Sequence, residues 1–137
     1  MIIEQSIFRK GYEMKKLLLF LLTMFLINSF VFPAHAETLE PIGIHRITFY
    51  CNCEKCCGRW ANGRTASGTI PARYRTIAVS TKEIPFGTVV KIDGFEQYRI
   101  AEDTGVAPGQ IDVYVPDHEE CLRLGLIYRE CFIVKGE

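Results

Sequence analysis

Apolar and polar residues alternate in short runs along the part of the chain that follows residue 43, and Gly, Pro, Asn and Asp punctuate the runs. A period of two is typical of strands with one buried face. The runs predicted to be strands are 44–50, 76–80, 88–93, 97–101, 111–115 and 130–135. Gly94 lies between the third and fourth of them, so these two are expected to form a hairpin.

One short helix is expected after Pro116. Asp117 is the predicted N-cap, Glu120 follows three residues later as in a capping box, and Gly125 is the expected stop. His118 falls in the first turn and receives no role. Six short strands with one helix predict an all-β fold, and a closed barrel would remove the edges that an open sheet of this size exposes.

The start of the chain has the pattern of a secretory signal peptide, assigned to residues 1–36. A basic start at 14–16 precedes an apolar run over 17–32, and Ala34-His35-Ala36 matches a cleavage signal. The alternative is a membrane anchor, for which the run is short of the roughly 20 apolar residues that a span needs. We therefore predict cleavage after Ala36, no stable membrane anchor afterwards, and a secreted or cell-wall location.

The remaining chain is predicted to consist of a linker over 37–43, which contains Pro41 and Gly43, and one domain over 44–137. The whole chain has 16 basic and 16 acidic side chains, and the segment 37–137 keeps 12 and 14 of them, a net charge of −2. Without a basic excess, nucleic acid is not an expected partner. Neither the oligomeric state nor a cofactor is indicated.

Four cysteines crowd into seven positions at Cys51, Cys53, Cys56 and Cys57. Disulfides, some of them to Cys121 or Cys131, are the favoured interpretation, because the count is even and an exported chain meets oxidising conditions. The alternative is a tetrahedral zinc site made of the four clustered thiolates. The spacing differs from that of a zinc ribbon.

Two acidic positions flank a Gly- and Pro-containing loop between the strands 97–101 and 111–115. Asp112 shares a strand face with Tyr114, whereas the adjacent Glu102 and Asp103 are expected to point to opposite faces. At most one of these two should therefore join Asp112. A solvated strand would produce the same pattern.

The polar connection over 59–75 is long enough to be functional. Trp60 is a candidate for stacking on a sugar ring, and Thr65 and Ser67 are candidates for hydrogen bonds to a substrate. The alternatives are that Trp60 seals the edge of the domain and that the two hydroxyl residues only form the turn.

Five motifs in one order resemble the three-aspartate (3D) domain family, which is related to the catalytic barrel of membrane-bound lytic transglycosylase A and to stationary-phase survival proteins of spore-forming bacteria. They are Thr65-Ala66-Ser67-Gly68, Thr76-Ile77-Ala78-Val79, Ile84-Pro85-Phe86-Gly87-Thr88, Ala101-Glu102-Asp103-Thr104-Gly105 and Ile111-Asp112-Val113-Tyr114. The resemblance implies a double-psi β-barrel that cleaves peptidoglycan glycan strands between N-acetylmuramic acid and N-acetylglucosamine and leaves 1,6-anhydro ends.

The resemblance also implies roles for individual residues. Asp103 would be the acid that protonates the leaving oxygen, with its pKa raised, and Asp112 would assist it. The residues expected to contact the glycan are Trp60, Thr65, Ser67, Ser80, Glu102 and Tyr114. No cofactor is implied. The attacking hydroxyl belongs to the substrate, so no second catalytic carboxylate is obligatory.

Two departures from the family pattern keep another function open. Ser80 stands where the family has its first aspartate, and the loop after Asp103 is short and lacks the family's lysine. The alternative function is a non-catalytic module that binds cell-wall glycan. A third is a thiol or zinc protein in which the cysteine cluster is the working part.

Overall fold

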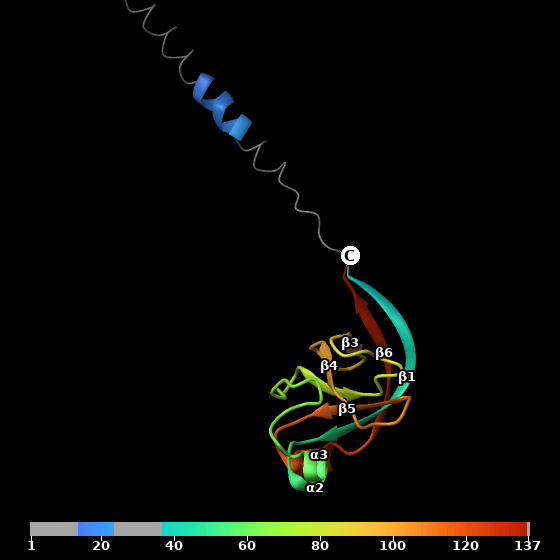
Figure 1. Ribbon diagram of the computed structural model, residues 1–137. Coiled ribbons are helices and arrows are strands. Elements are labelled where there is room, and N and C mark those ends of the chain that lie inside the picture. The colour runs from blue at the N-terminus through green and yellow to red at the C-terminus, as the bar shows by residue number, and fades with distance from the viewer. Residues whose placement is uncertain (1–13, 24–36, 137) are drawn as a thin grey trace, which may run out of the picture. The chain divides into compact units, whose positions relative to one another are not determined.

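The computed structural model describes residues 14–23 and 37–136, and in the second of these segments six strands close into a ring (Figure 1). The strands are β1 (Thr38–Tyr50), β2 (Thr76–Val79), β3 (Val89–Ile92), β4 (Arg99–Asp103), β5 (Gln110–Tyr114) and β6 (Ile127–Lys135). Their order around the closed barrel is β1-β5-β2-β4-β3-β6. Each strand of this ring pairs with two neighbours, so the expectation of an all-β fold with a closed sheet is confirmed.

The ring mixes parallel and antiparallel pairs. β1 runs parallel to β5 and β2 parallel to β4, while the remaining pairs are antiparallel. The hairpin predicted around Gly94 is present as β3 and β4. Because β1 and β5 are parallel, their C-terminal ends lie together at one end of the ring, where the loops that follow them also meet.

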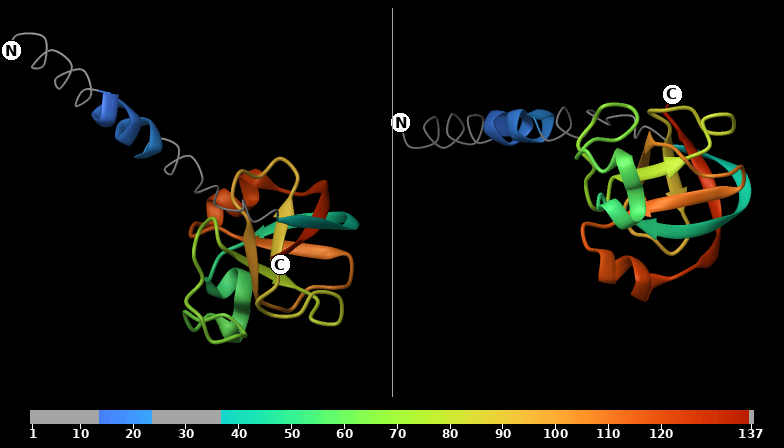
Figure 2. Two further views of the ribbon diagram at one scale, coloured as in Figure 1. Left: turned by 90° about the horizontal axis from the view of Figure 1, so that it is seen from above. Right: turned by 60° about the horizontal axis from the view of Figure 1, so that its bottom comes forward.

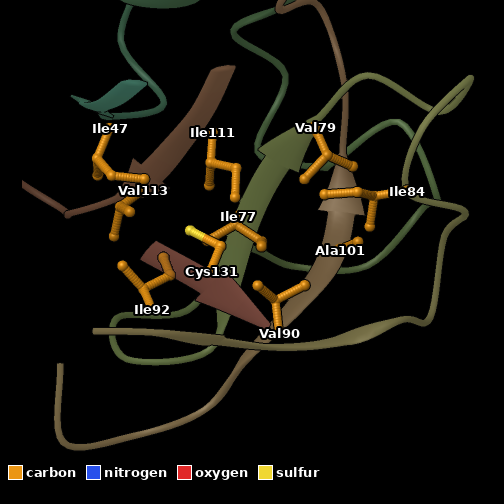
Figure 3. Close-up of a cluster of buried hydrophobic side chains, with 10 residues drawn as sticks. All are labelled: Ile47, Ile77, Val79, Ile84, Val90, Ile92, Ala101, Ile111, Val113 and Cys131. Atoms are coloured by element: carbon orange, nitrogen blue, oxygen red, sulfur yellow. The ribbon is translucent and has the colours of Figure 1, made fainter. Parts of the chain in front are cut away.

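Branched aliphatic side chains fill the inside of the ring (Figure 3). Ile47, Ile77, Val90, Ile92 and Ile111 are completely buried. Burial of an isoleucine or valine side chain contributes about 1.5–3 kcal/mol relative to full exposure, so this cluster supplies most of the ring's hydrophobic stabilisation. Residues next to them in sequence, such as Thr48, Ala78 and Asp112, lie on the other face of their strands.

The prediction of a linker over 37–43 is wrong, because most of this segment belongs to β1. Thr38 to Pro41 pair with Lys135 to Phe132 of β6, and the register shifts between Pro41 and Gly43. Gly43 adopts a φ of +88°, which suits glycine, so Pro41 and Gly43 form a bulge inside a long strand and do not end it. β6 begins at Ile127, earlier than predicted, and its added residues pair with the later part of β1, up to Ile47.

The predicted helix is α3 (His118–Leu124), and the side chain of its N-cap Asp117 accepts a hydrogen bond from the backbone N–H of Glu120. The structure adds two short elements that the sequence analysis did not predict, α2 (Glu54–Cys57) and the 3₁₀ turn η1 (Gly58–Trp60). α2 and α3 lie at the same end of the ring (Figure 1), and Figure 2 views this end from two further directions. Both follow directly from the ends of parallel strands, β1 and β5.

The N-terminal unit is described only over residues 14–23, which form a helix with exposed leucine side chains. The rest of the predicted signal peptide, including the cleavage site at Ala36, lies outside the described residues. Among the helices that the structure describes, none has the length and apolar character needed to cross a membrane. The signal peptide and the secreted location stay predictions.

Candidate functional site

Asp103 and Asp112 are brought level with each other across three neighbouring strands. Ala78 of β2 is in register with Asp112 of β5 on one side and with Asp103 of β4 on the other. Neighbouring strands are about 4.8 Å apart, so the two aspartates start from positions on either side of one small residue. The methyl group of Ala78 leaves room above the sheet for both carboxyl groups.

A bulge decides which acidic residue of β4 joins Asp112. Ile77 pairs with Ala101, and regular pairing would then place Glu102 opposite Ala78, but the register shifts and Asp103 takes that place. The carboxylate of Glu102 instead accepts hydrogen bonds from Thr76 Oγ1 at 2.6 Å and from Arg75 Nε at 3.1 Å. The prediction that at most one of the two acids joins Asp112 is confirmed. Glu102 is not part of the cavity lining that Asp103 and Asp112 share.

Three donors hold the carboxylate of Asp103. Tyr50 donates its hydroxyl to Oδ2 at 2.8 Å, and the backbone N–H groups of Ala66 and Thr104 donate to Oδ1 at 3.0 and 2.9 Å. Hydrogen bonds to a carboxylate are about twice as strong as those between neutral groups, and together these three fix its orientation. The bond from Ala66 also ties the long connection over 61–75 to the end of β4.

Asp112 has a different environment. Burial is the main cause that raises its pKa to about 6, the nearby charge of Asp103 adds to the rise, and the hydrogen bond from Thr48 partly opposes it. Thr48 Oγ1 donates to Asp112 Oδ1 at 2.9 Å and accepts from Gln110 Nε2 at 3.1 Å. Asp112 is therefore a carboxyl group that holds its proton well above the usual pH range for aspartic acid.

Both carboxyl groups face a cavity of about 730 Å³. The lining includes Trp60, Arg64 and Thr65 from the segment that follows β1, together with residues 103–106. Trp60 is 66% exposed, and the guanidinium of Arg59 lies 4.9 Å from the centre of its ring. A cavity of this size with an exposed indole and two carboxyl groups suits a polar ring-shaped substrate such as a sugar.

The structure brings only some of the predicted site residues together. Asp103, Asp112, Trp60 and Thr65 line the cavity. The others do not: the Ser67 hydroxyl lies 3.1 Å from that of Thr65, Ser80 is buried at a turn, and Tyr114 packs edge-on against Tyr50 with ring centroids 5.6 Å apart. These three residues, like Glu102, are not part of the cavity lining.

The cysteines are not paired in disulfides, which corrects that expectation. All six are free, and even the sulfurs of Cys51 and Cys53, 3.1 Å apart, are farther from each other than a disulfide bond of about 2.05 Å allows. Cys131 lies in the core of the ring, remote in sequence from the cluster, and an even cysteine count contains no information on such placement.

The thiols gather around a histidine. Cys51, Cys53 and Cys56 each have Sγ close to Nδ1 of His118, at 3.8, 3.5 and 3.3 Å. Cys57, the fourth member of the predicted thiolate set, points elsewhere, and its Sγ donates to the backbone carbonyl of Cys51 at 3.3 Å. The side chains in this cluster that could bind a metal ion are thus three thiols and one imidazole.

Sequence reasoning missed several residues of these two sites. Thr48 and Tyr50 are two residues apart on β1 and therefore point to the same face of the sheet. The period of two in the sequence could have predicted this common orientation. Arg64 and His118 had no such signal, because the first lies in an irregular loop and the second is 62 residues from Cys56.

No protein-family profile and no curated protein matches the sequence. Solved structures that are similar include a variant of the E. coli lytic transglycosylase MltA in an apo form, at a TM-score of 0.44 and 18% identity, and MltA from E. coli at a TM-score of 0.44 and 22% identity. Each match covers 54% of this chain and 27% or 28% of the MltA chain. At this distance the likeness carries no argument about activity, and membership of the 3D family stays a prediction from the motifs.

Proposed function

We propose that this protein is a lytic transglycosylase that cleaves the β-1,4 link between N-acetylmuramic acid and N-acetylglucosamine in peptidoglycan, and that its ring is a double-psi β-barrel. The observation that carries the proposal is the pair Asp103 and Asp112 facing one cavity from either side of Ala78. The order of five motifs in the sequence supports the same family.

The reaction needs a proton donor and a proton acceptor but no external nucleophile. The bond between the anomeric carbon and the leaving oxygen breaks as that oxygen receives a proton. The C6 hydroxyl of the same muramic acid then bonds to the anomeric carbon and gives up its proton to a carboxylate. The products are a 1,6-anhydro end and a free hydroxyl on the leaving sugar, so atoms and charge balance without water.

The environments of the two carboxyl groups favour a division of this work. Asp112, with its pKa raised to about 6, is suited to be the proton donor. Asp103, oriented by three hydrogen-bond donors, is suited to accept the proton from the C6 hydroxyl. The sequence resemblance assigns both steps to Asp103 alone, with Asp112 as its neighbour.

The function is tested by incubating the purified full chain with insoluble peptidoglycan and measuring the masses of the soluble products. Products one water lighter than those of a hydrolase, with 1,6-anhydro ends, support the proposal. Binding to peptidoglycan with no soluble product would contradict it and favour a glycan-binding module, the alternative that Ser80 in place of the family's aspartate suggests.

Two isosteric variants then separate the mechanisms. Asp103→Asn is expected to reduce product release by about 10²–10⁴-fold in either version, whereas Asp112→Asn does so only if Asp112 is the donor. Near wild-type product from Asp112→Asn, with the fold intact, would return both steps to Asp103. Product from Asp103→Asn at the wild-type rate would remove the carboxyl pair from the mechanism.

A further inference from the structure

We propose that Cys51, Cys53, Cys56 and His118 bind one Zn²⁺ ion in a closed tetrahedral site that holds one wall of the cavity. Their ligand atoms, three Sγ and Nδ1, all lie within 4.8 Å of one another. Thiolate and imidazole are the ligands that zinc takes in structural sites, and three cysteines with one histidine form one of its recurrent ligand sets. The inference does not depend on the proposed function.

The distances within the cluster agree with a single ion at its centre. Zinc lies about 2.3 Å from sulfur and about 2.0–2.1 Å from nitrogen, so tetrahedral geometry requires about 3.8 Å between two sulfurs and about 3.5 Å between sulfur and nitrogen. Cys51 Sγ and Cys56 Sγ are 3.7 Å apart, and the three Sγ–Nδ1 distances are 3.8, 3.5 and 3.3 Å. The largest departure among these distances is the pair Cys51 and Cys53, whose sulfurs are 3.1 Å apart.

Local structure explains why these four residues converge. Cys51 follows the last residue of β1, and Cys53 is the N-cap of α2, whose first turn places Cys56 next to it through a hydrogen bond from Cys56 N to Cys53 O at 3.1 Å. His118 is the first residue of α3. Because β1 and β5 are parallel, the segments that leave their C-terminal ends meet, which brings His118 to the thiols.

The position of His118 is supported from both sides. Asp117 caps α3, and Glu120, two residues beyond the histidine, accepts two hydrogen bonds from the guanidinium of Arg73. The backbone N–H of Val115 also donates to the carbonyl of Tyr50 at 2.9 Å, which joins the chain before α3 to the end of β1. The imidazole is thus held on a supported helix start.

The two remaining cysteines of this region lie outside the four-residue set, although Cys121 packs close to Cys51 and Cys56. Cys57 Sγ donates to the carbonyl of Cys51 at 3.3 Å, and Cys121 Sγ donates to the carbonyl of Asp117 at 3.2 Å. With four protein ligands no coordination position stays open for a substrate, which characterises a structural zinc site. Cys56 is exposed, so an ion can reach the ligands from solvent.

The site has a consequence for the cavity. Cys56 contributes to the cavity lining, and so do Asn52 and Trp60, which lie on the segment between β1 and the long connection. An ion that joins this segment to α3 would keep the wall in place beside Asp103. We therefore assign the metal an architectural role and no step of the chemistry.

The test uses the full chain, purified under reducing conditions and freed of metal, and titrated with Zn²⁺. Native mass spectrometry is expected to show one ion per chain, and Co²⁺ in its place is expected to produce the absorption of tetrahedral thiolate coordination. Disulfides among these cysteines in a parallel sample purified without reductant, or failure of the reduced chain to bind one zinc ion, would overturn the proposal.

Substitutions identify the ligands. His118→Ala is expected to weaken zinc binding by more than the roughly 10- to 100-fold that loss of a supporting hydrogen bond typically costs, and His118→Cys is expected to restore it. Cys57→Ser and Cys121→Ser are matched controls that remove a nearby thiol and are expected to bind one ion as the wild type does. Circular dichroism checks that each variant is folded.

Each result decides the question. Unchanged binding in a folded His118→Ala variant, or loss of binding in Cys57→Ser or Cys121→Ser, would overturn this ligand set. Because zinc content is measured without any glycan, a protein that binds zinc but releases no muropeptide would refute the proposed function and leave this inference standing.

Discussion

Two clusters at the same end of the ring are built in different ways. Tyr50 and Cys51 are consecutive residues, yet the first holds Asp103 of the carboxyl site and the second belongs to the thiol cluster. The carboxyl site stands on three adjacent strands, so the register of the sheet determines it. The thiol cluster stands on a short helix, a helix start and a strand end, which backbone pairing alone does not hold at fixed distances.

This difference indicates which of the two sites needs a bound ligand to keep its geometry. Strand register is maintained by the ladder of hydrogen bonds and by the buried isoleucines beneath it, so the aspartates keep their places without a ligand. Loops and short helices are the parts of a domain that open most easily. The cluster therefore depends on a bound ion for its order, and four predictions separate the two sites.

The largest expected effect comes from the carboxyl site alone. Asp103→Asn should reduce the release of muropeptides by about 10²–10⁴-fold, because it removes the proton acceptor, while the zinc content stays at one ion per chain. Product release and metal content are measured on the same preparation. Loss of zinc together with activity would mean that the two sites are not independent.

Removal of zinc should affect the thiol cluster and leave the carboxyl site folded. If free zinc exceeds its dissociation constant about 100-fold, binding stabilises the fold by about 2.7 kcal/mol, and a chelator should lower the melting temperature by roughly 10 °C or more. The strands of the carboxyl site should stay folded below that temperature, as hydrogen exchange of β2, β4 and β5 would reveal. A melting temperature that ignores the chelator would contradict this prediction.

The raised pKa of Asp112 predicts how activity and stability depend on pH. Activity should fall by about tenfold per pH unit above roughly 6, as the proposed donor loses its proton. The folded state holds this proton more tightly than the unfolded state, whose pKa is near 3.9, so stability is lost as pH rises from about 4 to above 6.

Asp112→Asn is the control for that pH dependence. The amide cannot ionise, so the variant should gain about 1–3 kcal/mol relative to wild type at pH 7 and no advantage at pH 4. Thermal unfolding at the two pH values measures this. An equal difference between variant and wild type at both values would show that the pKa of Asp112 is not raised.

The smallest effect is expected at the residue where the two sites meet. Tyr50→Phe removes one donor to Asp103 and leaves the backbone of Cys51 in place. A hydrogen bond to a charged group contributes about 1.5–3 kcal/mol, so activity should fall by about 10- to 100-fold with zinc binding unchanged. Kinetics and metal titration of this variant measure both sites at once.

Much of the architecture could be read from local patterns. The period of two predicted the strands, and Asp117 with Glu120 predicted the start of α3, because strand faces and helix caps depend on residues only a few positions apart. The same reasoning placed Asp112 on the face of Tyr114 and limited Asp103 and Glu102 to one partner between them. It wrongly predicted a linker at Pro41 and Gly43, because whether these residues end a strand or form a bulge depends on the partner strand β6.

The sequence by itself determined which residues alternate along each strand and which carry chemistry. Only the tertiary structure decided that a bulge in β4 turns Asp103 and not Glu102 toward Asp112, and that His118 and not Cys57 completes the thiol cluster. The physical reason is common to both cases. Register shifts and the meeting of parallel strand ends are set by pairing between segments far apart in the chain, and no local pattern contains that information.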